Sequence, residues 1–155
     1  EKTDRVQALS KLMGDAGLRA PVRPRIRDDM WVKIWGNVSL NPISALTGGT
    51  LAEMIDDSEV CGVIRASMIE AQQVGEALGV KFAIDVEKRI AGAREVGDHK
   101  TSMLQDLELG RPMEIDALVA SVQELGRIVG VATPTIDIVL GLVKQRARLA
   151  GCYDG

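Results

Sequence analysis

Residues that bind transition metals are scarce in this sequence. It holds one histidine, His99, and two cysteines, Cys61 and Cys152, which lie far apart in the chain. They match no metal-ligand spacing, so a metalloenzyme is disfavoured and we expect no bound metal. The cysteines are expected to be small buried side chains in a reducing cytoplasm, with a disulfide between them as the alternative.

Aromatic and basic residues are also too few for a typical nucleic-acid-binding surface. Aromatic side chains make up 3% of the 155 residues, and the formal net charge is -3. Phosphate binding draws most of its affinity from clustered lysine and arginine, and single-strand binding relies on exposed aromatic rings. We therefore expect no nucleic-acid partner.

Long apolar runs are missing as well. No stretch approaches the ~18 apolar residues that cross a bilayer, and residues 1–4 carry no apolar signal segment. We expect no membrane partner and a cytoplasmic location. The chain also lacks an initiator methionine and opens within a helical pattern, so we expect a piece of a longer polypeptide.

Glycine-rich turns of the kind that hold a nucleotide pyrophosphate do not occur in the sequence.

Hydrophobic residues make up 46% and charged residues 26%, close to the average of globular proteins. The length suits one compact core. Every strong local signal is helical, and we predict an all-α, multi-helix domain.

Residues 1–27 are predicted to form a separate segment. Apolar residues at helical spacing follow a possible cap at Thr3, which indicates a short amphipathic helix. Residues 18–27 hold two prolines and alternating arginines, and they suit an extended connector. We place a domain boundary here, and residues 28–155 form the main helical domain.

Helix signals follow one another through the main domain. Its first helix is expected to start after a cap at Asp28 or Asp29, to bury a face that carries both tryptophans, and to break at Thr47. Ser58, and either Thr101 or Ser102, are expected to cap later helices. The further expected helices are a short turn over residues 50–54 and longer helices over 58–78, 85–94, 102–110, 114–129 and 134–151.

A column of polar side chains stands on the helix that carries the tryptophans. Lys33, Asn37 and Asn41 are each four residues apart, so on a helix they lie about one turn from one another along one side. An ammonium group and two amides can orient a small hydroxy or keto acid. The alternative is a surface lysine and capping asparagines, with Asn41 before Pro42 ending the helix.

A second polar cluster lies far along the chain. Ser102 is expected at a helix N-terminus, where free N–H groups and the helix dipole favour a carboxylate. Glu114 and Asp116 begin the next predicted helix. The structural alternatives are plain capping for Ser102 and compensation of the helix dipole for the two acids. Read together, the column and this cluster predict one substrate site.

Two ordered motifs resemble those of the ketopantoate reductase family. The first is Trp31-x-Lys33-x-x-x-Asn37-x-x-x-Asn41-Pro42. The second is Ser102-Met103-Leu104-Gln105-Asp106, followed by Gly110-Arg111-Pro112-Met113-Glu114-Ile115-Asp116. The resemblance covers about residue 28 to the C-terminus and implies the helical C-terminal domain of that family, which is related to the C-terminal fold of 6-phosphogluconate dehydrogenase.

The resemblance also implies a reaction and a role for each site residue. Members of the family are oxidoreductases of pantothenate biosynthesis that reduce 2-dehydropantoate to pantoate with NADPH, and an N-terminal Rossmann domain carries the NADP cofactor. By this resemblance Lys33 is the catalytic general acid that protonates the carbonyl oxygen. The substrate-binding residues that it implies are Asn37, Asn41, Ser102 and Glu114.

The same resemblance implies that residues 1–27 are the tail of a missing Rossmann domain plus a connector, and that the chain is inactive without that domain. The expected partners are a small 2-keto or 2-hydroxy acid, the chain's own Rossmann domain and a second copy in a homo-oligomer. One alternative is a reductase of a different 2-keto acid. Another is a noncatalytic helical homodimerisation module, in which the polar stripes serve as caps and a solvated face.

Overall fold

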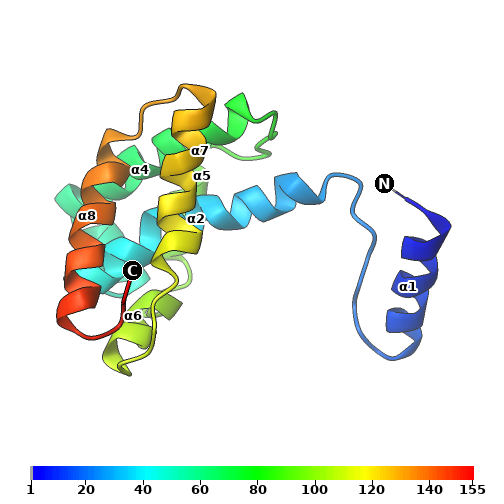
Figure 1. Ribbon diagram of the computed structural model, residues 1–155, viewed down its shortest axis with the longest axis horizontal. Helices are drawn as coiled ribbons and strands as arrows, with labels where there is room; N and C mark the ends of the chain where they lie inside the picture. The colour runs from blue at the N-terminus through cyan, green and yellow to red at the C-terminus, as the bar shows by residue number, and fades with distance from the viewer. Residues whose placement is uncertain (1) are drawn as a thin grey trace.

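The computed structural model describes residues 2–155, and every regular element within them is a helix (Figure 1). The predicted all-α fold is therefore confirmed. In chain order the elements are α1 (Asp4–Asp15), α2 (Ile26–Thr47), α3 (Leu51–Asp56), α4 (Ser58–Ala77), α5 (Val86–Arg94), α6 (Ser102–Glu108), the π-helical turn η1 (Asp116–Ala120), α7 (Ser121–Val129) and α8 (Pro134–Leu149).

Helix α1 stands apart from the main body, at the end of an extended connector (Figure 1). It begins where the sequence predicts, with the Thr3 hydroxyl accepting a hydrogen bond from the backbone N–H of Val6. None of its residues is buried, and its apolar side chains face solvent, with Leu12 67% exposed. The short amphipathic helix is thus confirmed, but its apolar stripe packs against nothing in the described chain.

Helix α2 is the spine of the main body, because α4, α6 and α8 all pack against it. Its buried centre is Trp35, which is fully buried and whose indole N–H donates to the carbonyl of Met68 in α4 at 2.8 Å. The ring also meets Phe82 edge-on, with the centroids 4.8 Å apart. The predicted tryptophan-bearing face is therefore the core-facing side of this helix.

The N-terminus of α2 differs from the expectation that Asp28 or Asp29 caps it. The helix begins at Ile26, and these two acids lie inside its first turn. Their carboxylates pair with guanidinium groups of the connector, Asp28 with Arg25 and Asp29 with Arg23 at 2.8 Å, so they bind side chains instead of backbone N–H groups. They still complement the positive end of the helix dipole.

Proline 42 does not end α2, so the interpretation of Asn41 as a helix-terminating residue is wrong. The helix continues through Pro42 to Thr47 and ends at Gly48, which has a φ of 76°. Because Pro42 is buried within the body, packing on all sides outweighs the lost backbone hydrogen bond. The column of Lys33, Asn37 and Asn41 therefore lies on one unbroken helix.

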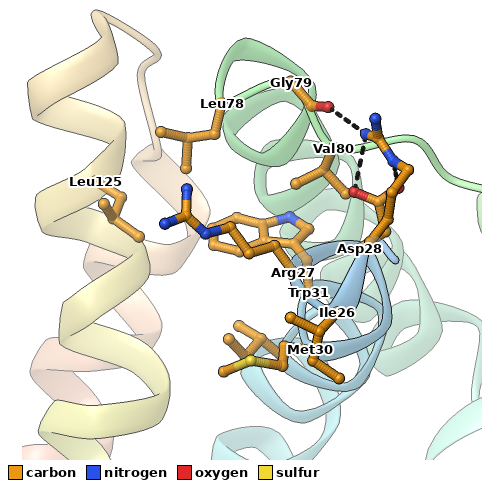
Figure 2. A pocket seen from close by; sticks show the side chains of 11 residues that line it. Ile26, Arg27, Asp28, Met30, Trp31, Leu78, Gly79, Val80 and Leu125 are labelled. Carbon is orange, nitrogen blue, oxygen red and sulfur yellow. Dashed lines mark hydrogen bonds and ion pairs between the residues drawn. The ribbon is translucent and has the colours of Figure 1, made fainter. Parts of the chain in front are cut away.

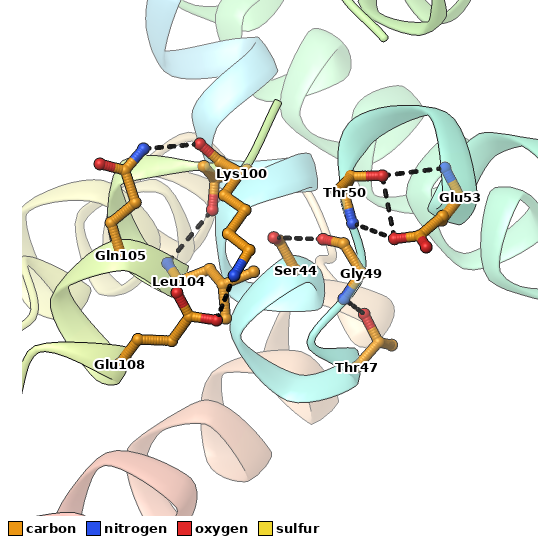
Figure 3. Close-up of polar contacts among 10 residues, drawn as sticks. Ser44, Thr47, Gly49, Thr50, Glu53, Lys100, Leu104, Gln105 and Glu108 are labelled. Carbon is orange, nitrogen blue, oxygen red and sulfur yellow. Dashed lines mark hydrogen bonds and ion pairs between the residues drawn. The ribbon is translucent and has the colours of Figure 1, made fainter. Parts of the chain in front are cut away.

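Caps fix the ends of the next helices (Figure 3). Thr50 and Glu53 form a reciprocal capping box on α3, where the sequence predicts a short turn. Asp57, not the predicted Ser58, caps α4, because its carboxylate accepts from two backbone N–H groups that a serine hydroxyl one residue later cannot reach. Thr101, one of the two predicted candidates, caps α6 by accepting from the N–H of Leu104.

The helix predicted over residues 114–129 is not a single α-helix. It starts as the π-helical turn η1 and becomes regular only at Ser121 in α7. The Ser121 hydroxyl donates to the carbonyl of Ala117 within this wider turn. Such single π-turns are frequent at functional sites, and this one begins two residues after Glu114.

A glycine of α4 makes room for the second tryptophan. A Cβ on Gly75 would meet the indole of Trp31, with its Cδ1 only 2.5 Å away. Real Cβ contacts are longer than this, so a side chain here would displace the ring. Trp31 can therefore pack directly against the backbone of α4.

Both cysteines are free and buried, Cys61 in α4 and Cys152 beyond α8. The expectation that they are small buried side chains is confirmed. The disulfide considered as the alternative is not present.

Candidate functional site

The predicted polar column runs from solvent into the interior along α2. Lys33 is exposed, Asn37 is half-buried, and Asn41 is only 6% exposed. Because α2 is helical throughout, the three side chains keep the one-turn spacing that the sequence implies. The column therefore offers an ammonium group at its outer end and an amide at its buried end.

The second predicted cluster lies on elements that neighbour α2. Ser102 is the first residue of α6, which packs against α2, and it is exposed. Thr101 makes the capping hydrogen bond, so the Ser102 hydroxyl is not needed for that role. Glu114 is exposed just before η1, which also packs against α2. The structure thus brings the elements together, while the assignment of these side chains to a substrate stays a prediction.

Buried neighbours hold the Glu114 backbone in place. Met113 and Ile115, on either side of it, are both buried in the core. The N–H of Met113 donates to the carbonyl of Cys152 at 2.9 Å. Glu114 therefore projects from a fixed stretch of chain, as a binding residue requires.

A pocket of about 580 Å³ lies between the N-terminal half of α2, the end of α4 and α7 (Figure 2). Side chains of Met30, Leu78 and Leu125 border it, and none of the five predicted site residues lines it. Sequence reasoning missed this pocket. The available signal was the apolar series Ile26, Met30 and Ile34 at four-residue spacing, of which only Ile34 belongs to the predicted tryptophan-bearing face.

Arg25 ties the rim of this pocket together. Its guanidinium binds the carboxylate of Asp28 and donates to the carbonyl of Gly79 at 3.0 Å. The hydrogen bond from Arg25, opposed in part by burial, lowers the pKa of Asp28. This contact joins the end of α4 to the start of α2.

Asp116 lies in the first turn of η1 and belongs to a cluster of side chains from the C-terminal part of the chain, which the sequence did not predict. Its carboxylate pairs with Lys144 of α8 at 2.8 Å and accepts from the Tyr153 hydroxyl at 2.8 Å. The hydrogen bonds from Lys144 and then Tyr153 hold the pKa of Asp116 below its usual value. The cluster fastens the C-terminal residues to η1.

Replacement of Asp116 by asparagine is expected to destabilise the fold near neutral pH and to lose its effect in acid. A carboxylate whose pKa is lowered by folding contributes stability above its unfolded pKa, and this contribution disappears as the pH falls through the folded pKa. Urea unfolding of both proteins between about pH 6 and about pH 2 measures this, and the difference should shrink steadily below about pH 4. A difference independent of pH would contradict the assignment.

The described residues do not fit a nucleotide cofactor on their own. All elements of residues 2–155 are helices, and no glycine-rich turn after a strand exists among them to receive a pyrophosphate. In the same range, no group of three or more histidine, cysteine or acidic residues could hold a metal ion. None of the helices in this range combines the length and the apolar character of a membrane span.

Comparison with known proteins connects this geometry to a family. The family model of the C-terminal region of ketopantoate reductase PanE/ApbA matches residues 25–147. A 2-dehydropantoate 2-reductase of Mesorhizobium japonicum is 60% identical over 154 residues, which is 99% of this chain and 47% of that protein.

Two solved structures share the fold. A candidate ketopantoate reductase from Ralstonia solanacearum MolK2 superposes with a TM-score of 0.91 at 44% identity, over 97% of this chain and 46% of that one. The 2-dehydropantoate 2-reductase from Methylococcus capsulatus gives 0.85 at 32% identity, over 96% and 52%. The chain thus spans about half the length of the relatives it matches.

Proposed function

The chain belongs to the ketopantoate reductase family, whose C-terminal domain it matches, and on this premise we propose that it is the substrate-binding half of an NADPH-dependent 2-dehydropantoate 2-reductase. The observation that carries the proposal is the column on α2. Its ammonium group and two amides share one side of an unbroken helix, in the order of the family motif that this sequence resembles.

Lys33 is the proton donor in this proposal. It is exposed and forms no ion pair with a carboxylate in residues 2–155, so its ammonium is available to a substrate. When a ketone is reduced, negative charge develops on the carbonyl oxygen, and a positioned ammonium stabilises that charge and then supplies the proton. The product is the 2-hydroxy acid.

The other four residues hold the acid in place. Asn37 and Asn41 orient it from the deeper end of the column, where their amides can both donate and accept hydrogen bonds. Ser102 contacts the carboxylate from the N-terminus of α6, and Glu114 binds or orients the substrate. These roles place the keto oxygen towards the outer end, beside Lys33.

The hydride comes from NADPH in this proposal, held mainly by an N-terminal Rossmann domain of a longer polypeptide. Residues 1–27 are then the tail of that domain and the connector. The exposed apolar stripe of α1 supports this, because such a stripe normally packs against a partner surface. By itself, the 155-residue chain should not oxidise NADPH.

The test is NADPH oxidation by the full-length parent polypeptide with ketopantoate and a panel of other 2-keto acids. Turnover of ketopantoate well above the panel supports the named reaction. If another acid is turned over instead, the proposed reaction class stands and the proposed substrate is replaced by that acid. NADPH oxidation by the isolated 155 residues would contradict the proposal that a separate N-terminal domain binds the cofactor.

A noncatalytic homodimerisation module is the second candidate. The exposed leucines of α1 and the apolar pocket beside α2 favour it, because both would be covered by a partner. A folded, NADPH-binding full-length protein without turnover of any acid in the panel would point to this function.

A further inference from the structure

Helix α5 carries an arginine that the five assigned residues leave out. The Arg89 side chain extends from α5 to the backbone of α2 at Gly36. A Cβ on Gly36 would meet the Arg89 guanidinium, with Cζ at 3.0 Å and Nε at 3.2 Å. A glycine inside a helix costs about 1 kcal/mol relative to alanine, and here its missing side chain is the space that the guanidinium occupies.

The charge of Arg89 is not neutralised by the described chain. Its Nε is buried and has no hydrogen-bond partner, and no ion pair joins it to a carboxylate in residues 2–155. The other partly buried arginine of this region, Arg65, binds Glu87 at 2.6 Å. A partly buried guanidinium without an anion is costly, and a bound anion would offset that cost.

The position of Arg89 relates it to the polar column. Gly36 lies three residues after Lys33 in α2, so the two positions are neighbours on the helix surface, and it directly precedes Asn37 in the chain. Two cationic groups, the Lys33 ammonium and the Arg89 guanidinium, therefore approach the same turn of α2. A 2-keto acid carries two oxygen groups on adjacent carbons, a carbonyl and a carboxylate.

We propose that Arg89, which lies over Gly36, binds the carboxylate of the substrate while Lys33 binds and protonates the keto oxygen of the substrate. This inference rests on the proposed function and deepens it, because it makes the negative charge of the acid a condition for binding. Ser102 is then the neutral contact of the carboxylate and Arg89 the charged one. Arginine suits this role because its charge persists at all physiological pH values.

The test compares a 2-keto acid with its neutral methyl ester as substrates of the full-length polypeptide. Arg89→Met should raise KM for the acid about 10- to 100-fold, the usual weight of a hydrogen bond to a charged group. KM for the ester and for NADPH should change little, so discrimination between acid and ester collapses. Arg89→Lys should retain part of it.

Gly36→Ala provides an independent route, since its Cβ displaces the guanidinium without removing the charge. It should also weaken discrimination between acid and ester. Gly92→Ala, in α5 with open space around it, is the matched control and should behave like the wild type. Circular dichroism verifies that each variant is folded.

Two results would overturn the inference in different ways. If the wild type turns over the acid and folded Arg89→Met keeps its preference for acid over ester, Arg89 is a packing residue and the proposed function stands. If the wild type turns over no 2-keto acid, the proposed function fails and the role of Arg89 fails with it.

Discussion

Lys33→Ala in the full-length polypeptide is expected to lower kcat for the 2-keto acid by about 100- to 10,000-fold, the usual contribution of a positioned general acid. The variant can still bind the acid through the remaining residues, so KM should change much less than kcat. The fold should be intact, because Lys33 is exposed and holds no ion pair within residues 2–155. Steady-state NADPH oxidation measures the loss.

Two further variants sharpen this expectation. Lys33→Arg keeps the positive charge but holds its proton too tightly to release it, so it should recover little of the lost kcat. Lys88→Ala removes another exposed lysine, on α5, and should turn over like the wild type. A folded Lys33→Ala enzyme with unaltered kcat would show that the polar column is only a solvent-exposed surface of α2, as expected for a noncatalytic interaction module.

Glu70→Ala is expected to destabilise the chain by about 4 kcal/mol. Glu70 is only 8% exposed, and its two carboxylate oxygens accept from the backbone N–H groups of Thr135 and Ile136 at 2.8 and 2.9 Å. It thereby caps α8 from α4, since the Thr133 hydroxyl donates to Asp137 and leaves those N–H groups free. Each buried donor left without an acceptor costs about 1–3 kcal/mol.

Urea unfolding measures this loss, and the series of variants separates charge from hydrogen bonding. Glu70→Gln keeps one acceptor oxygen and should lose roughly half as much stability. Glu76→Ala is the matched control, because Glu76 is exposed in the same helix and bonds only the side chain of Gln72. Equal stability of Glu70→Ala and Glu76→Ala would contradict the capping role.

Most of the fold could be predicted because helix ends leave local chemical signals. Thr3, Thr50 and Thr101 cap helices at or near the expected positions, and Gly48 and Gly130 end helices in the left-handed conformation. An error arose where a neighbouring residue was the better acceptor, since Asp57 and not Ser58 caps α4. The cap of α8 comes from Glu70, 65 residues away in the chain, and no local pattern reveals it.

The candidate site was less accessible to sequence reasoning. The column on α2 could be predicted because its spacing depends only on helical geometry, once packing carries the helix through Pro42. The contact between Arg89 and Gly36 joins two helices whose relative positions depend on how the core packs. The spacing of residues in the sequence therefore could not predict it. The pocket beside Met30 likewise depends on where α7 packs.

The most direct test of the account is a crystal structure of the full-length polypeptide with NADP and pantoate. We expect the C2 hydroxyl oxygen of pantoate, which derives from the keto group, to lie within about 3 Å of the Lys33 Nζ, with the amides of Asn37 and Asn41 turned towards the ligand. Pantoate bound in the apolar pocket beside Met30 and Leu125, away from the column, would contradict the assignment of the column as the substrate site.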